Sequence, residues 1–405
     1  MLTLLSIPPA VTLVCGFLLA LALSFLLTGL IGRLCRRMGW LDQPSERRVH
    51  RVAVPRLGGV AIFLAFLLTA LLIYWPGSFH EALVYIGFLP AALFITAVMA
   101  YDDVVGLPPG IKLGLQTVAV VLLILPGLVF GSAHEHGALI SYVNNPLKIA
   151  HLLNAATLDI PLLLALPFTW FWTVGMMNTI NFVDGLDGLA GGITMIASII
   201  LMVVSVLLNQ DLVAVLCGIF AGSVLGFLPH NWHPAKIFMG DSGAMFLGLT
   251  LAVLANIGGA KVATVLLLLG IPVLDVALVI LQRLRGGRGA MHYDMRHLHH
   301  KLLESGFSQR QIVLLYYSLT GFCGLLAVLA LILPDALPLA SSISIEGASL
   351  AHLIGLILVG VVMALMLGIV LRRQRRQPRP LQSPRQSQGL SQPTPTPQGG
   401  GVRKG

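Results

Sequence analysis

The sequence predicts an all-α protein that crosses a lipid bilayer many times. Hydrophobic residues make up 57% of the 405 residues and charged residues only 10%, whereas soluble domains carry about 25% charged residues. The mean hydropathy is +0.90, and the apolar runs are long enough to span a bilayer as helices. The four cysteines are scattered without metal-ligand spacing, so we expect neither a disulfide nor a cysteine metal site.

About eleven apolar runs are expected to be membrane-spanning helices. They lie near residues 8–32, 58–75, 83–100, 113–131, 160–177, 190–208, 212–229, 244–258, 262–282, 312–334 and 350–371. The first run is too long for the apolar part of a signal peptide and lacks a clear cleavage site, so it predicts a membrane anchor. An odd number of spans would put the two termini on opposite sides of the membrane.

Positively charged residues distinguish the two sides of the predicted membrane domain. All lysines and arginines except Lys148 and Lys261 fall in loops that lie on one side or in the C-terminal tail. Cytoplasmic loops are enriched in such residues, so this side is expected to be cytoplasmic and the N-terminus to lie outside. This bias accounts for the net charge of +9 without a nucleic-acid partner. We expect a membrane domain over 1–371 and a basic, disordered tail over 372–405.

Polar clusters interrupt the apolar pattern on the predicted cytoplasmic side. Asp102 and Asp103 directly follow one span, and Asp241 stands in Gly-Asp-Ser-Gly just before another. A carboxylate at the centre of a membrane helix costs about 2.5–3.5 kcal/mol, so such clusters indicate a function. Adjacent carboxylates are typical of a cation site or a general base, although a solvated helix-end pair has the same sequence. For Asp241, capping of a helix is the alternative.

The densest cluster repeats with a spacing of three residues. Its members are Asn178, Asn181, Asp184 and Asp187. On a helix, neighbours in this series lie about 60° apart, and a tighter turn at the glycines that follow would align them better. Oxygen ligands of this kind suit Mg²⁺, which binds through one or two carboxylates plus substrate phosphates. A cluster that only caps helices is the alternative interpretation.

Basic and imidazole side chains follow in two further loops. Arg296, His297, His299 and His300 form one group, in which His297 and His300 are one helical turn apart and His299 is expected to point elsewhere. Zinc is an alternative ligand, but its usual partners are missing, so contacts to phosphate and sugar hydroxyls are favoured. Arg56, before Gly58-Gly59, would clamp a phosphate or simply contribute to the positive-inside charge.

Asp275 is the one acidic residue placed well inside a predicted span. An intramembrane carboxylate is a functional candidate by default. Two interpretations are open, a direct catalytic role and pairing with a loop arginine such as Arg283.

Taken together, these motifs resemble the polyprenyl-phosphate N-acetylhexosamine-1-phosphate transferase family. The resemblance covers about residues 30–315 and follows the family's order of motifs. These are Pro55-Arg-Leu-Gly-Gly59, Asp102-Asp103 with Lys112, Asn178 to Gly191, Gly240-Asp-Ser-Gly243, and His297-Leu-His-His300. The peptidoglycan branch has three consecutive histidines, whereas His-Leu-His-His is similar to the undecaprenyl-phosphate N-acetylglucosaminyl 1-phosphate transferase branch, which serves teichoic acid, lipopolysaccharide O-antigen or similar polymers.

The resemblance implies an enzyme of the bacterial inner membrane with its active site on the cytoplasmic face. It would transfer N-acetylglucosamine-1-phosphate from a UDP-sugar to undecaprenyl phosphate and release UMP, with Mg²⁺, or alternatively Mn²⁺, as cofactor. UDP-N-acetylfucosamine, UDP-N-acetylquinovosamine and the phospho-N-acetylmuramoyl-pentapeptide donor are alternatives, and a homodimer is an open alternative to a monomer. A secondary transporter is the rival class, but it would place polar residues near mid-depth.

The resemblance also implies a role for each candidate residue. The catalytic set is Asp102, Asp103 and Asp241. The metal set is Asp241, Asn181 and Asp184. The nucleotide- and sugar-binding set is Asn178, Asp187, Lys112, Arg296, His297, His299 and His300, with Asp187 facing the uracil. The set for the lipid phosphate is Arg56, Asp102 and Lys112.

Overall fold

The computed structural model describes residues 9–43, 53–131, 137–140, 142–144, 157–257, 261–285 and 297–332, with scattered helical residues between 355 and 368. Most of these residues are helical, as the sequence predicts. Arg296, the predicted tail over 372–405 and most of the predicted span at 350–371 lie outside the described residues.

Each predicted span up to residue 334 corresponds to a helix or to a pair of helices. The helices are α1 (Pro9–Met38), α2 (Gly58–Ile73), α3 (Phe79–Val105), α4 (Pro109–Phe130), α5 (Leu162–Val183), α6 (Leu189–Leu207), α7 (Asp211–Asn231), α8 (Gly240–Asn256), α9 (Lys261–Leu268), α10 (Gly270–Arg285), the short α11 (Leu298–Glu304) and α12 (Gln309–Ile332). Two antiparallel strand pairs complete the described part, β1 (Leu41–Asp42) with β2 (Val54–Pro55) and β3 (Tyr142–Asn144) with β4 (Thr157–Asp159).

The described helices make the protein a multi-pass membrane protein. Seven of them are long and apolar enough to cross a membrane. The pair α9–α10, bent by 76°, adds an eighth crossing if it counts as one span. The helices α2 and α8 have 16 and 17 residues, which is short for a hydrocarbon core about 30 Å thick. The total of eleven spans therefore stays a prediction.

Several helices extend beyond the apolar runs that predicted them. Asp102 and Asp103 lie in the last turns of α3, and α5 continues to Val183, so the loop expected over 178–189 is reduced to 184–188. Hydropathy marks the part of a helix that lies in hydrocarbon, whereas the backbone hydrogen bonds of a helix continue through polar turns at the membrane surface. The polar clusters are thus fixed on helix ends rather than on long loops.

Small side chains let α1 pack closely along α7. Gly16, Ala20 and Ser24 follow one another at four-residue spacing and are buried, and Gly16 lies against Ile219 of α7. Close approach through small residues is the usual way in which membrane helices associate. The opposite side of α1 exposes large apolar residues such as Leu26, as expected for a surface against lipid.

The core lies where α2, α7 and α8 meet. Phe66, Phe220 and Phe246, one from each of these helices, are fully buried and pack edge-to-face in all three pairs. Edge-to-face packing sets the positive edge of one ring against the negative face of another. This aromatic cluster fixes α8 in the centre of the bundle, and Asp241 lies in the first turn of α8.

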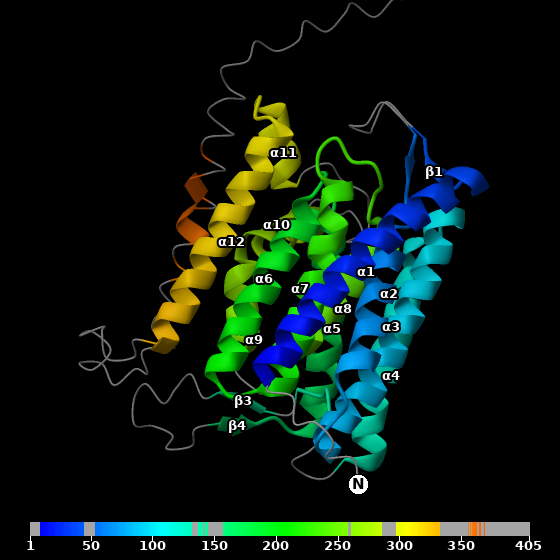
Figure 1. The fold of residues 1–405 in the computed structure, drawn as a ribbon. Coiled ribbons are helices and arrows are strands. Elements are labelled where there is room, and N and C mark those ends of the chain that lie inside the picture. The colour runs from blue at the N-terminus through cyan, green and yellow to red at the C-terminus, as the bar shows by residue number, and fades with distance from the viewer. Residues whose placement is uncertain are drawn as a thin grey trace, which may run out of the picture.

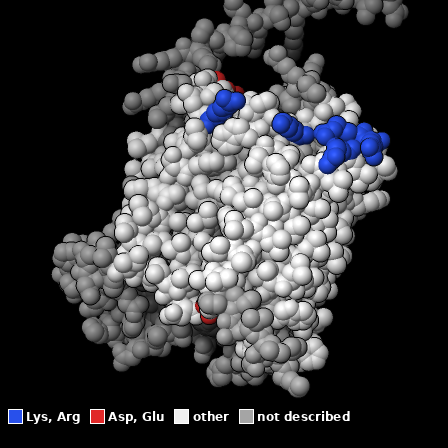
Figure 2. All heavy atoms as spheres, in the orientation of Figure 1, with Lys and Arg blue, Asp and Glu red and all other residues white. Residues whose placement is uncertain are grey.

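The two ends of the bundle differ in charge. Figure 1 shows α11 and the β1 strand at one end and the β3–β4 pair at the other. Figure 2, in the same orientation, shows the described lysines and arginines gathered on the visible face near the end that carries α11 and β1. The ends of α3, α5 and α7 and the starts of α4, α6 and α8 lie at this same end (Figure 1).

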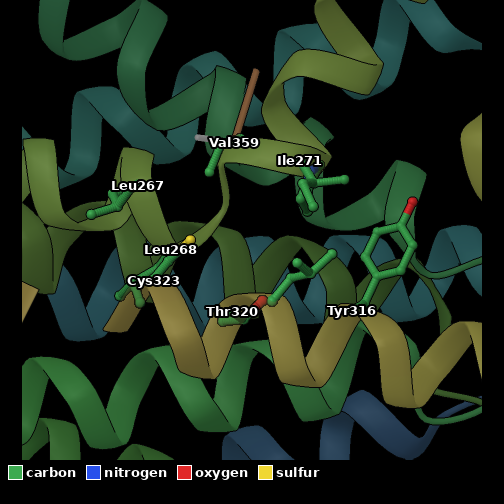
Figure 3. Close-up of a pocket in the computed structure, with 9 residues that line it drawn as sticks. Leu267, Leu268, Ile271, Tyr316, Thr320, Cys323 and Val359 are labelled. Atoms are coloured by element: carbon green, nitrogen blue, oxygen red, sulfur yellow. The ribbon is translucent and has the colours of Figure 1, made fainter. Parts of the chain in front are cut away.

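A small pocket lies where α9 gives way to α10. Its lining is mostly apolar and comes from α9, α10, α12 and Val359 (Figure 3). The hydroxyl-bearing residues Tyr316 and Thr320 and the thiol of Cys323 are the polar part of the lining. The carboxylate clusters are not part of this pocket.

Candidate functional site

Asp103 joins the end of α3 to the start of α8. Its Oδ1 accepts a hydrogen bond from the backbone N–H of Asp241 at 2.8 Å, and its Oδ2 accepts one from the N–H of Ser242 at 3.1 Å. The first N–H groups of a helix have no partner within the helix and carry the positive end of its dipole, so a carboxylate is stabilised there. Two motifs separated by 138 residues are thereby held together.

Gly240 is required by this contact. Its φ of +75° belongs to the left-handed region, which residues other than glycine rarely adopt. A Cβ added at this position would overlap the carboxylate of Asp103. The glycine before Asp241 in Gly-Asp-Ser-Gly therefore serves the packing of the two acidic segments.

Lys112 bridges two carboxylates. Its Nζ lies 2.5 Å from Asp102 Oδ2 and 2.7 Å from Asp241 Oδ2. Asn181 of α5 donates to the other oxygen of Asp241 at 3.0 Å, and the N–H of Leu107 donates to Asp102 at 2.6 Å. Asp241, Lys112 and Asn181 come from three different helices, so the site exists only in the assembled bundle.

Asp184 adds a further carboxyl group beside this cluster. It follows the last residue of α5. Burial, and then the carboxylates of Asp241, Asp103 and Asp187, raise the pKa of Asp184 to about 8. Lys112 is the lysine paired with this group of acidic residues, and a second cation beside it would favour the ionised form of Asp184.

The donor atoms fit a hard cation better than zinc. The groups that converge are the carboxylates of Asp102 and Asp241 and the side-chain amide of Asn181, whose Nδ2 faces Asp241. Among the described residues, no three His, Cys, Asp or Glu side chains are grouped so that they could hold a metal alone. Mg²⁺ binds proteins through one or two carboxylates and completes its shell with waters and substrate phosphates. Asp241, with Asn181 and Asp184 near it, can supply such a partial shell.

The first motif packs directly against the Gly-Asp-Ser-Gly segment. Phe238 N–H donates to Pro55 O at 2.8 Å, and the N–H groups of Gly58 and Gly59 donate to the carbonyls of Phe238 and Met239 at 2.9 and 2.8 Å. Gly59 lies against the backbone of Gly243, with no space for a side chain. The motif therefore holds in place the residues that lead into α8.

Arg56, within this motif, is paired with Asp42 of β1 at 3.0 Å. Arg56 lies in the segment that packs against the start of α8, but its ion pair is with a strand residue rather than with the acidic cluster. Its role toward a lipid phosphate stays a prediction.

Asn178 lies on α5 one turn before Asn181. Its Nδ2 donates to Gln116 Oε1 at 2.9 Å and to the carbonyl of Val174 at 2.8 Å. These contacts tie α5 to α4, and the role of Asn178 toward the nucleotide stays a prediction. Gln116 gave no signal in the sequence because it stands alone in an apolar run.

The histidine segment is held by Asp275. The carboxylate oxygens of Asp275 lie 3.0 Å from His297 Nδ1 and 2.9 Å from the N–H of Leu298, and both Asp275 and His297 are buried. The contacts of Asp275 in the structure are thus with His297 and with the start of α11. Its two predicted roles, catalysis and pairing with Arg283, stay predictions, and the side chain of Arg283 lies outside the described residues.

The histidines form a stack that reaches α5. His297 lies between Phe182, at a ring distance of 5.3 Å, and His299 at 5.8 Å, and His299 is 4.3 Å from His300. The expectation that His299 points away was wrong, because His297 precedes α11 as its N-terminal cap instead of lying within a continuous helix. Nε2 of His299 is buried without a hydrogen-bond partner and faces Gly185.

Asp187 is engaged by a residue that the sequence did not single out. His233 Nδ1 lies 2.7 Å from Asp187 Oδ2, and the N–H of Ala235 donates to the same oxygen at 3.1 Å. His233 follows α7 in a Trp-His-Pro-Ala loop and has no spacing that links it to Asp187. Such a pairing across 46 residues is visible only in the folded chain.

The fold and the site define a polytopic membrane protein with an acidic, cation-compatible cluster and adjoining histidines at one end of its helix bundle. A family model described as Glycosyl transferase family 4 matches residues 85–259. The chain belongs to this family, and the resemblance to polyprenyl-phosphate N-acetylhexosamine-1-phosphate transferases is confirmed. It is therefore a membrane enzyme of the glycosyl-1-phosphate transferase kind.

Three relatives illustrate this membership. The chain is 36% identical over 334 residues to a decaprenyl-phosphate N-acetylglucosaminephosphotransferase of Mycobacterium leprae, which covers 75% of this chain and 80% of the relative. It is 30% identical over 332 residues to a probable undecaprenyl-phosphate N-acetylglucosaminyl 1-phosphate transferase of Bacillus subtilis, covering 80% and 86%. It is 28% identical over 326 residues to a phospho-N-acetylmuramoyl-pentapeptide-transferase of Clostridium perfringens, covering 77% and 95%.

Proposed function

We propose that the protein transfers N-acetylglucosamine-1-phosphate from UDP-N-acetylglucosamine to a polyprenyl phosphate and releases UMP. The observation that carries the proposal is the bridge of Lys112 between Asp102 and Asp241, beside Asn181 and Asp184. The printed names of the relatives in Mycobacterium leprae and Bacillus subtilis supply the sugar and the class of lipid.

The reaction joins two anions, and this sets the task of the site. An oxygen of the lipid phosphate forms a bond to the sugar-bearing phosphorus of the donor, and the diphosphate bridge breaks with its electron pair leaving on UMP. Two unit charges 4 Å apart repel by about 1 kcal/mol in water and about 4 kcal/mol at an effective dielectric of 20. Catalysis of phosphoryl transfer therefore rests mainly on positioning and on charge stabilisation.

Lys112 is the residue best placed for that task. Its ammonium group is half-buried between two carboxylates, where it can exchange one of them for a phosphate oxygen of a substrate. A Mg²⁺ ion, or alternatively Mn²⁺, held by Asp241 with Asn181 and Asp184 near it, would neutralise further phosphate charge. His297, His299 and His300 lie beside the turn after α5 and would bind the sugar and diphosphate.

The site needs to position the phosphate of the acceptor lipid more than it needs to remove a proton from it. A phosphate monoester has a second pKa of about 6, so most of the lipid phosphate is a dianion at neutral pH. Asp103 is occupied by two backbone N–H groups, and Asp102 by Lys112 and Leu107. We infer that both carboxylates chiefly hold Lys112 and the start of α8 in place.

The charge of the bundle supports a cytoplasmic site in the bacterial inner membrane. Described lysines and arginines gather near the end that carries the acidic cluster (Figure 2), as the positive-inside rule requires of a cytoplasmic face. A site at this depth can meet both a water-soluble nucleotide and a phosphate whose polyprenyl chain stays in the bilayer.

The test is a donor comparison with purified protein in detergent. We expect UMP release and a lipid-linked product with UDP-N-acetylglucosamine and undecaprenyl phosphate, and no release when the lipid is omitted. The donors UDP-N-acetylfucosamine, UDP-N-acetylquinovosamine and UDP-N-acetylmuramoyl-pentapeptide are assayed in parallel. Preference for one of these would overturn the choice of sugar, and release of no UMP with any donor would overturn the reaction.

A further inference from the structure

The loop between α7 and α8 makes a contact that the catalytic cluster does not need. His233 and the N–H of Ala235 both bind Oδ2 of Asp187. The other oxygen, Oδ1, makes no hydrogen bond to another residue in the described part of the chain, and the Asp187 side chain keeps 17% of its surface exposed. One oxygen is therefore fixed by the protein, and the other is available to a ligand.

His233 is itself anchored from α12. Arg310 Nη2 donates to the backbone carbonyl of His233 at 3.2 Å. The ring of its neighbour Trp232 lies 6.4 Å from that of Tyr317, and the hydroxyl of Tyr317 donates to the carbonyl of Gly188 at 2.5 Å. The first turns of α12 thus hold both the loop that carries His233 and the turn that carries Asp187.

Asn231 joins the same two segments from the other side. Its Oδ1 accepts from the N–H of Gly188 at 3.0 Å, and its Nδ2 donates to the carbonyl of Ile237 at 3.0 Å. The side chain of Asn231 is buried. The position of His233 relative to Asp187 is therefore defined by several independent hydrogen bonds.

We propose that His233 is a positioning residue that orients Asp187 so that its Oδ1 accepts an N–H from the donor's pyrimidine base. The inference rests on the proposed function, since it requires a UDP-sugar donor. Uracil presents an imide N–H at its N3 position, whereas cytosine has an unprotonated nitrogen there. A carboxylate oxygen held in place would accept a hydrogen bond from the N3–H of uracil, but it would face the lone pair of the cytosine nitrogen. By holding Asp187 in this position, His233 would contribute to recognition of the base.

Base recognition gives a kinetic signature that a merely structural role would not. A hydrogen bond to a charged group, once lost, weakens binding by about 10- to 100-fold. His233→Ala should therefore raise KM for the UDP-sugar by about tenfold, with kcat within about twofold and KM for the polyprenyl phosphate unchanged. Lys236→Ala, in an exposed position of the same loop, is the matched control and should leave both KM values unchanged.

Two further variants test whether the effect of His233 depends on its contact with Asp187. His233→Asn keeps an N–H donor near the position of Nδ1 and should restore most of the lost donor affinity. In an Asp187→Asn background, His233→Ala should add little, because the two residues act on one contact. Additive effects in the double variant, or an equal loss of kcat and of affinity for both substrates, would contradict the proposal.

A measurement on the unaltered protein keeps the proposal testable if a variant fails to fold. UMP should inhibit the reaction at least about tenfold better than UMP methylated at N3, which lacks the imide N–H. Equal inhibition by the two nucleotides would overturn base recognition through Asp187. A protein that releases no UMP from any UDP-sugar would instead overturn the proposed function, so the two failures are distinguishable.

Discussion

Lys112 Nζ lies 2.7 Å from Asp241 Oδ2, although the two residues are 129 positions apart. The first turn of α4 and the first turn of α8 meet at this contact. Asp102 holds the same ammonium group from α3. A lysine that pairs with two carboxylates from two other helices therefore lies at the centre of the candidate site.

Asp241→Asn should abolish transfer while leaving the protein folded. The variant keeps the shape of the side chain but removes the charge that pairs with Lys112 and would bind the metal. We expect kcat to fall by about 100-fold or more. UMP release is measured together with thermal unfolding in detergent. Asp211→Asn, an exposed change at the start of α7, is the control. A folded Asp241→Asn protein with near-normal turnover would refute the metal assignment.

Lys112→Met should lower kcat/KM by about 10- to 100-fold, because it leaves two carboxylates facing each other without their cation. Lys112→Arg keeps the charge, so it should retain more activity than the Met variant. The exposed Lys236→Met change serves as a control for loss of a lysine at the same end of the bundle. Equal activities of the Met and Arg variants would argue against a role for the charge.

Gly240→Ala should damage both stability and activity. The added Cβ would overlap Asp103, and the positive φ would be strained, with a cost of about 1–3 kcal/mol. Gly114→Ala is the matched control, because Gly114 lies in α4 with open space where a Cβ would go, and alanine is the better helix former. Equal unfolding temperatures for the two variants would contradict the clamp between Asp103 and α8.

His299 should make the stability of the protein depend on pH. Burial, and then the neighbouring His300 and His297, lower the pKa of His299 well below its usual range. The unfolded chain therefore binds more protons below pH about 6.5, and stability is full above that pH and falls as the pH decreases. Unfolding temperatures measured from pH 8 to pH 5 should decline less steeply for His299→Phe, and parallel curves would count against the prediction.

The sequence predicted the helices and the end of the bundle at which the polar clusters meet. Long apolar runs and the bias of lysines and arginines carry that information locally. The ends of the helices were harder to predict than their existence, because α5 continues through Asn178 and Asn181 although both residues are polar. The break between Leu268 and Gly270 lies inside one apolar run, so hydropathy could not reveal it.

The pairings within the site could not be derived from the sequence. Family resemblance brought Asp102, Lys112 and Asp241 to one site, but not the bridge that Lys112 makes between the other two. The contact between His233 and Asp187 could not be predicted, because a single histidine after an apolar helix has no periodic partner in the sequence. Such contacts depend on how distant helix ends pack, which no local pattern encodes.

The most direct test of the central claim is the dependence of UMP release on a divalent cation. Purified protein is treated with a chelator, assayed with UDP-N-acetylglucosamine and undecaprenyl phosphate, and then titrated with Mg²⁺ or Mn²⁺. If Asp241 binds the metal, transfer should stop in the chelator and return with added metal in the wild-type protein, but not in Asp241→Asn. Full product formation in the presence of the chelator would contradict a role for a divalent cation at Asp241.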